Sequence, residues 1–357
     1  MILKEGFKSD EFLISCIFCI LIWRYLSLPL DTARIHDVPD DPMHAIDYCF
    51  EQGWTDGLPV VPPIVDRVDE MLLYEGQPAE TVVASHSVTG FECTIYAAAV
   101  NAVMAGCKPE YLPVIVAAME AMNEPDFNFH GSTASTGGSS PLLVVSGPMA
   151  EDLGMNSDAN LFGPGNRANA TIGRTIRLIL MNVFRMIPGI SDKSTQGNPG
   201  KYSLCIAERD RGNPWPLLVE EQSYPLGVSS VTVFAGGGFC NVENHGANTP
   251  EQVLDTLADT MANYGCLSLG QSAVVLAPEH ARIISGAGWN RAQVREYLFT
   301  NAYRQIIDLK SVGKFRQKDY DRQHIDGSKS PLVKRDQLHR GLTPEDILLV
   351  VELVAEK

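Results

Sequence analysis

The residues best suited to chemistry lie in two polar stretches on either side of a short apolar run at 142–146. The first stretch, 129–141, is rich in Ser, Thr and Gly, and its candidate substrate-binding residues are Ser132 and Thr136. The second leads into an amphipathic helix, and its candidates are Asn156, Asn160, Asn166, Arg167, Asn169 and Arg174. Backbone N–H groups at a helix N-terminus favour an anion, and an arginine beside them can bind a carboxylate or phosphate bidentately. The second stretch therefore predicts a site for a small anionic substrate.

A structural explanation of the same loop stays open. Asn and Gly build turns, and Asn169 is well suited to cap the helix that follows. Against this, a polar loop of such length between two apolar elements is more often functional than idle. We expect a ligand site in the loop as a whole, while any single Asn in it is more often structural.

Three side chains are candidates for catalysis: His130, His245 and Glu208. Each histidine precedes a glycine in loop-like sequence, where an imidazole is reachable and titrates near neutral pH. Either one suits a general acid or base, and a hydrogen-bonded structural histidine is the alternative for each. His86 is a weaker candidate. Cys93, near the start of a predicted helix, would have a lowered thiol pKa there, with packing as a small apolar residue as the alternative.

The sequence predicts no metal site and leaves the cofactor unassigned. His130, His245, Glu208 and Cys240 lack the short spacings that mark zinc ligands. The glycines at 236–238 follow a predicted strand, but their spacing matches neither the dinucleotide nor the P-loop pattern.

Composition limits the classes of partner and compartment. The chain has 357 residues, of which 45% are hydrophobic, and a formal net charge of -15. Such a charge argues against a nucleic-acid partner, because binding to phosphates needs a basic face. Eight scattered cysteines are typical of a reduced compartment and favour the cytoplasm. An apolar run at 12–23 leaves membrane anchoring or export open.

The expected fold class is α/β, a mixed sheet with helices packed around it. The expected domains are a hydrophobic leader and linker at 1–41, an α/β core at 42–309, and a charged arm with a C-terminal segment at 310–357. Apolar periodicity and capping residues predict the elements of the core. The helices are expected at 45–52, 65–74, 92–104, 110–122, from 169 onward, 249–263 and 290–304, and the strands at 142–146, 201–207, 228–235 and 272–277.

Two internal likenesses bear on the arrangement of the core. Residues 143–148 resemble 273–278, and 103–107 resemble 260–266, so two similar lobes with the site between them would explain both. The alanine-rich segment 97–105 needs a neighbour whose backbone comes very close. If the chain does not supply that neighbour, a second copy would, and we predict a homo-oligomer.

Four phrases carry a resemblance to a known family: Gly53-Trp-Thr-Asp-Gly-Leu-Pro-Val-Val-Pro-Pro63, Asn101-Ala-Val-Met-Ala-Gly-Cys-Lys-Pro-Glu-Tyr111, Phe162-Gly-Pro-Gly-Asn-Arg-Ala-Asn-Ala-Thr-Ile-Gly-Arg174 and Gly200-Lys-Tyr-Ser-Leu-Cys-Ile-Ala-Glu208. Over about residues 43–305 the chain resembles a bacterial family of large proteins that look like the partners of UGSC-type domains, which are small thiol or selenol proteins. The resemblance implies an enzyme or large enzyme subunit, such as a thiol-linked oxidoreductase or lyase. Because the chain has no Cys-Gly-Ser-Cys, a redox thiol of this kind would come from a separate UGSC-type protein. A non-catalytic subunit for small-ligand binding or assembly is the alternative.

Overall fold

The computed structural model of the chain describes residues 36–38, 41–208, 210–222, 224–225, 227–263, 270–326 and 333–352. The chain divides into two compact units. Unit 1 comprises the chain up to Asn156, Phe162–Ala207 and Pro225–Gly237; unit 2 comprises Ser157–Leu161, Glu208–Tyr224 and the chain from Gly238. Most of the expected leader and linker, 1–35 with 39 and 40, lies outside the described residues.

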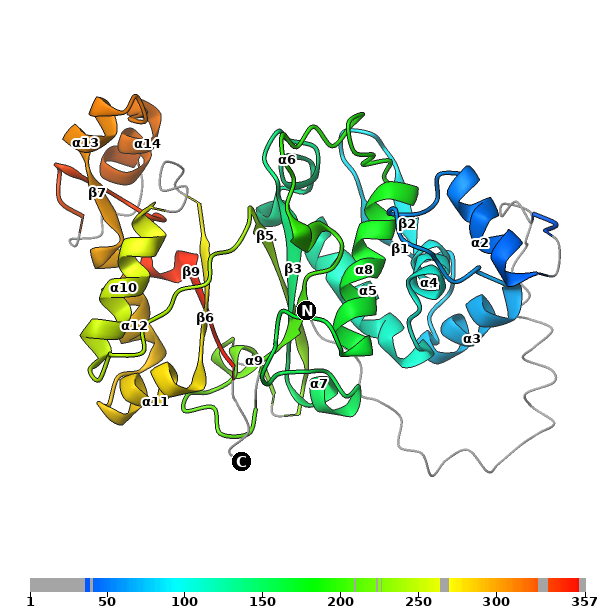
Figure 1. Cartoon of the computed structure of the whole chain (residues 1–357), viewed down its shortest axis with the longest axis horizontal. Coiled ribbons are helices and arrows are strands. Elements are labelled where there is room, and N and C mark those ends of the chain that lie inside the picture. Colours follow the sequence, from blue (N-terminus) through cyan, green and yellow to red (C-terminus); the bar gives the residue numbers. More distant parts are fainter. Residues whose placement is uncertain are drawn as a thin grey trace. The chain divides into compact units, whose positions relative to one another are not determined.

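Unit 1 is built on a three-stranded mixed sheet with the strand order β4-β3-β5 (Figure 1). The central strand, β3 (Ser140–Ser146), pairs in parallel with β4 (Cys205–Ala207) and antiparallel with β5 (Ser230–Gly236). Leu143, Val144 and Val145 of β3 are fully buried, as expected of a central strand covered on both faces. The predicted α/β class with a mixed sheet is therefore confirmed.

Helices α5 (Leu112–Asn123) and α8 (Arg167–Asn182) pack against this sheet, and α4 (Ile95–Ala105) packs on both of them (Figure 1). Ala98, Ala99 and Ala102 of α4 are fully buried. Helix α8 packs directly against α4, and the small alanine side chains let the two helices come close together. Helix α8 is therefore the neighbour that the alanine-rich face needs. The alanine-rich face is thus covered within one chain, so it no longer supports a homo-oligomer. The homo-oligomer stays a prediction.

The remaining elements of unit 1 extend the helical layers and connect them to the sheet. They are α2 (Pro42–Glu51), α3 (Val65–Glu75), the antiparallel pair β1 (Val82–Ser85) and β2 (Glu92–Thr94), α6 (Phe129–Thr133) and α7 (Pro148–Asp152). Of these, α3 packs against α4, and β1 packs against α5. The buried apolar residues of all these layers form one cluster within the unit.

Helix α8 comes unusually close to the chain leading into β4. A Cβ atom added at Gly173 would lie 2.4 Å from the Ser203 hydroxyl oxygen and 2.8 Å from the Leu204 backbone nitrogen. A backbone atom cannot rotate away as a side chain can, so only glycine fits at this contact. The close approach brings the next turn of α8, which carries Arg177, over Lys201.

Unit 2 has a separate apolar core and two small sheets. β6 (Ser272–Leu276) pairs in parallel with β9 (Ile347–Val351), and β7 (Tyr303–Gln305) pairs antiparallel with β8 (Gln337–His339). Its helices are α9 (Leu218–Glu221), α10 (Pro250–Asn263), α11 (Pro278–Gly286), α12 (Arg291–Asn301), α13 (Ile306–Ser311) and α14 (Gln317–Asp321). The buried apolar residues of α10, α12, β6 and β9 meet in one cluster.

The domain boundary expected at 309 differs from the observed division. Within the expected arm, described residues 310–326 and 333–352 contribute α14, β8 and β9 to unit 2. Leu338, Ile347 and Leu349 are buried there. The core therefore extends past 309, because scattered apolar residues among many charges still supply two strands.

Two predicted helix starts are displaced in the structure. The Thr89–Glu92 pattern predicts a helix from residue 92, but 92–94 pair with β1 instead, and Thr94 caps α4. Helix α8 is capped by Asn166, whose side chain accepts a hydrogen bond from the Asn169 backbone at 3.1 Å. In each case another residue of the same polar segment takes the capping role that the sequence pattern predicts.

The likeness of 143–148 to 273–278 corresponds to the same local structure in both units. In unit 1, β3 is followed by α7, which begins at Pro148; in unit 2, β6 is followed by α11, which begins at Pro278. Proline fits the first turn of a helix because its missing N–H has no intrahelical partner there.

Candidate functional site

Two polar loops meet at the end of the unit 1 sheet where the central strand, β3, begins. The first loop, 134–139, leads into β3, and the second, 191–201, lies between α8 and β4. The Thr195 backbone N–H donates to the Thr136 carbonyl at 3.1 Å, and the Asn198 amide donates to another carbonyl of the first loop. These bonds hold the predicted Ser/Gly stretch against the second loop.

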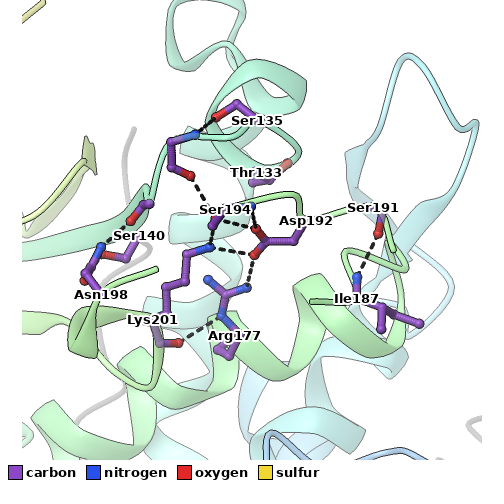
Figure 2. Close-up of polar contacts among 12 residues, drawn as sticks. Thr133, Ser135, Ser140, Arg177, Ile187, Ser191, Asp192, Ser194, Asn198 and Lys201 are labelled. Atoms are coloured by element: carbon purple, nitrogen blue, oxygen red, sulfur yellow. Dashed lines mark hydrogen bonds and ion pairs between the residues drawn. The ribbon is translucent and has the colours of Figure 1, made fainter. Parts of the chain in front are cut away.

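Four polar side chains gather under these loops, as Figure 2 shows: Arg177 from α8, with Asp192, Ser194 and Lys201 from the second loop. We call them the Asp192 cluster. Lys201 Nζ lies 2.6 Å from Asp192 Oδ2, and Arg177 Nη1 lies 3.7 Å from the same oxygen. Ser194 Oγ lies 2.5 Å from Asp192 Oδ1, accepts a hydrogen bond from Lys201 Nζ, and lies 2.8 Å from the Gly137 carbonyl oxygen.

The charges of the Asp192 cluster do not cancel. Burial acts to raise the pKa of Asp192, but hydrogen bonds from Lys201 and Ser194 outweigh it and leave this pKa lowered. Burial lowers the pKa of Arg177, but a guanidinium stays protonated at neutral pH. Asp192 is the carboxylate that pairs with both cations. Asp56 also acts on Arg177, but Arg174 binds both of its oxygens, so one positive charge is left in excess. Within the part of the chain that the structure describes, Lys201 Nζ has two hydrogen-bond acceptors for its three N–H groups.

The predicted Asn-rich loop is tied to α8 by its own hydrogen bonds. Asn169 Oδ1 accepts from the Asn156 backbone at 2.9 Å, and Asn169 Nδ2 donates to the Asn156 carbonyl at 2.9 Å. Asn166, the cap residue, donates from Nδ2 to the Gly154 carbonyl at 2.7 Å. The structure thus brings three predicted residues together, and the contacts they make are those of a turn and a helix cap.

Both predicted arginines bind groups of the chain itself. Arg167 donates from Nε and Nη2 to the Gly106 carbonyl, at 3.0 Å and 2.8 Å. This carbonyl lies at the C-terminal end of α4, where the helix dipole favours a cation. Arg174 binds both carboxylate oxygens of Asp56, at 2.9 Å and 2.8 Å, and the Pro59 carbonyl at 2.9 Å. The two guanidinium groups therefore tie α8 to other segments of unit 1.

The other predicted substrate-binding residues lie apart from this capping arrangement. Ser132 donates its hydroxyl to the Phe127 carbonyl at 2.9 Å, within the turn that contains α6. Thr136 is exposed in the first polar loop. Asn160 belongs to unit 2 and adopts a left-handed backbone with φ of 65°.

His86 and His130 form a hydrogen-bonded pair in unit 1. The His86 ring is fully buried, and its Nδ1 accepts a hydrogen bond from the Thr89 backbone at 3.2 Å. This contact places the His86 proton on Nε2, which lies 3.3 Å from His130 Nδ1 and can donate to it. Burial lowers the pKa of His86, and His130 adds to this effect, so His86 is neutral near pH 7.

The contact with His86 orients the imidazole of His130, which solvent can reach. His130 is exposed, and because its Nδ1 accepts from His86, the neutral ring carries its proton on Nε2 and can donate it from there. A ring whose second nitrogen is held by another group presents its N–H in a fixed direction, which suits a proton donor to a substrate. His86, the weaker candidate by sequence, is thus the positioning partner of His130.

The other two predicted catalytic residues belong to unit 2. Glu208 is buried, its Oε1 lies 2.6 Å from Arg291 Nη2, and its Oε2 accepts from the Leu218 backbone at 2.8 Å. His245 is exposed in the stretch before α10. The predicted set is therefore divided between the units, and Glu208 is engaged in holding unit 2 together.

The buried cysteines do not provide a reactive thiolate. Burial raises the pKa of Cys93 to about 12 and that of Cys107 to about 11. Burial also raises the pKa of Cys205. The prediction of a lowered pKa at Cys93 is therefore wrong, because the residue lies in β2 with no exposed surface. The alternative, that Cys93 packs as a small apolar residue, is confirmed.

Sequence reasoning missed the Asp192 cluster. Its only local sign is the polar run Asp192-Lys193-Ser194, which looks like an ordinary turn. Arg177 stands next to Ile176 on the apolar side of α8 and is buried, and a charged residue in such a position is a sign of a buried partner. No spacing rule connects it with Lys201, whose carbonyl accepts from Arg177 Nε at 2.9 Å.

Among the described residues, no group of three or more His, Cys, Asp and Glu side chains is arranged to hold a metal ion. The helices of this part of the chain all lack the length or apolar character needed to cross a membrane. No protein-family model, curated protein or solved structure matches the chain.

Proposed function

We propose that this chain is an enzyme, or the large subunit of one, that binds a small anionic substrate at the Asp192 cluster. The observation that carries the proposal is the excess positive charge of Arg177 and Lys201 over Asp192. Charges that are largely removed from water need partners, and a carboxylate or phosphate of the substrate would be that partner. A charge-assisted bond from Lys201 would orient it.

The pair of His86 and His130 supports an enzyme over a binding protein. The buried His86 sets the tautomer of the exposed His130, which leaves an oriented N–H that can donate to a bound substrate. The described buried thiols are protonated, so a thiol-linked reaction would use a thiol of the substrate or of a separate UGSC-type protein. A non-catalytic binding subunit would use the same anion site without turnover.

The binding part of the proposal is tested by thermal shift with small carboxylates, phosphates and thiols. A ligand at 100 times its Kd should add about 2.7 kcal/mol to the free energy of unfolding. Lys201→Met should lower the affinity for a compound found in this screen about tenfold or more, because the substitution removes a charge-assisted bond. Lys193→Met is the matched control, since Lys193 is exposed in the same loop and donates to the Gly189 carbonyl.

Arg167→Gln separates this site from the predicted Asn-rich loop. Because Arg167 is bound to the Gly106 carbonyl, we expect its loss to cost about 1 kcal/mol of stability and to leave anion affinity unchanged. Affinity lost in Arg167→Gln but kept in Lys201→Met would place the ligand at the start of α8 and refute the proposal.

Turnover of any hit, with and without a UGSC-type protein, then distinguishes enzyme from binding subunit. His130→Gln should abolish most of the turnover and retain binding, whereas His44→Gln, at an exposed histidine of α2, should change neither. Binding without turnover under both conditions would favour the non-catalytic alternative.

A further inference from the structure

Unit 2 contains a cavity of about 470 Å³ that is lined by residues of α13, α14 and the segment before β8. This volume falls in the range of roughly 300–1,000 Å³ that small-ligand sites occupy. The cavity belongs to a different unit from the Asp192 cluster and does not depend on the function proposed for that cluster.

One wall of the cavity is apolar and aromatic. Phe315 and Tyr320 lie with their ring centroids 6.2 Å apart and their planes tilted by 56°. Ile307 of α13 also lines the cavity and is 71% exposed. His324 stacks on the Tyr320 ring with the centroids 4.2 Å apart, and Lys310 Nζ lies over the Phe315 ring, but both aromatic residues stay partly exposed. A planar group would cover the apolar surface that still meets water.

The polar part of the lining carries an excess positive charge. Lys310 and Arg335 line the cavity together with a single carboxylate, that of Asp336. Lys310 Nζ lies 4.9 Å from the centroid of the Phe315 ring, so the cation and the aromatic wall are adjacent. No ion pair joins Lys310 or Arg335 to a carboxylate within residues 270–326 and 333–352, the described part of this region.

The backbone fixes these groups relative to one another. The Ile306 backbone donates to the Asp336 carbonyl at 2.9 Å, and β7 pairs with β8 just beyond it. The start of α13 and the segment with Arg335 are therefore held side by side, which presents the charged and apolar walls in one geometry.

We propose that this cavity is a second ligand site, which takes a planar aromatic carboxylate. Its ring system would pack against Phe315 and Tyr320, and its carboxylate would face Lys310 and Arg335. Such a ligand matches both walls at once: the ring covers apolar surface, and the acid supplies the negative charge that the lining lacks.

The test uses three naphthalene probes of similar size and different charge: 2-naphthylacetate, 2-(2-naphthyl)ethanol and 2-(2-naphthyl)ethylamine. Their Kd values are measured on the full chain by calorimetry or probe fluorescence. We expect the acetate to bind about tenfold or more tightly than the amine, with the alcohol between them. Equal affinities for the three, or no binding of the acetate at millimolar concentration, would overturn the proposal.

Variants locate the bound probe. Lys310→Gln and Arg335→Gln should each remove most of the preference for the acetate, and Phe315→Leu should weaken all three probes. Lys318→Gln is the matched control, because Lys318 is exposed on α14 and does not line the cavity. Lys310→Arg should retain the preference and shows that charge is the cause. An acetate preference that survives in both Gln variants would place the probe elsewhere and contradict the assignment.

Discussion

Glu208→Gln is expected to lower the free energy of unfolding by about 3–5 kcal/mol, the usual result of removing one partner from a buried ion pair. Arg291 is 2% exposed and Glu208 is 3% exposed, and the atoms that join them are 2.6 Å apart. The variant keeps the shape of the side chain but leaves the Arg291 guanidinium buried with Glu221, at 3.6 Å, as its remaining carboxylate partner among the described residues.

The measurement is urea unfolding of the wild type, Glu208→Gln and the double variant Glu208→Leu/Arg291→Met. The double variant should recover much of the loss, because an apolar pair of similar volume leaves no charge uncompensated. The sequence points to Glu208 as a catalytic residue, which predicts a different outcome. A stable Glu208→Gln variant that has lost turnover would favour catalysis over the structural role.

Asp192→Asn should have the second-largest effect, a loss of about 2–4 kcal/mol, because Lys201 is partly exposed and the pair is less completely buried. The variant would leave Arg177 and Lys201 facing each other without a carboxylate. An added anion should therefore stabilise Asp192→Asn more than the wild type. The same anion should not rescue Glu208→Gln, and equal rescue of both variants would contradict a specific site at Asp192.

Asp192 also predicts a dependence on pH. Its pKa is lowered in the folded chain relative to the unfolded value of about 3.9. The resulting stability is present above this value and is lost as the pH falls through the lower folded pKa. Acid unfolding followed by circular dichroism should show a shallower loss below about pH 4 in Asp192→Asn than in the wild type.

Local sequence signals predicted much of the secondary structure. Pro250 starts α10 after Thr249, and Asn290 caps α12, as the patterns at these positions indicate. The apolar runs at 142–146 and 272–276 form β3 and β6. Where the prediction failed, as at 92–94, pairing with β1, ten residues earlier in the chain, outweighed a local helix pattern.

The site was less predictable, because its contacts join residues far apart in the sequence. Arg167 and Arg174 stand where an anion site is expected, yet their partners are Gly106 and Asp56, 61 and 118 residues earlier. The polar groups of an anion-binding loop and of a helix cap are the same in sequence. Only the tertiary contacts show which of these groups are already satisfied by the chain and which cations are left in excess.

A crystal structure with selenate tests the central claim most directly, because anomalous scattering locates the selenium of this sulfate- and phosphate-like probe without ambiguity. We expect a selenate oxygen at hydrogen-bond distance, about 2.8 Å, from Lys201 Nζ. The anion should be missing from the same position in Lys201→Met. A selenium peak beside Asn166 and Arg167 at the start of α8, with none at Lys201, would contradict it.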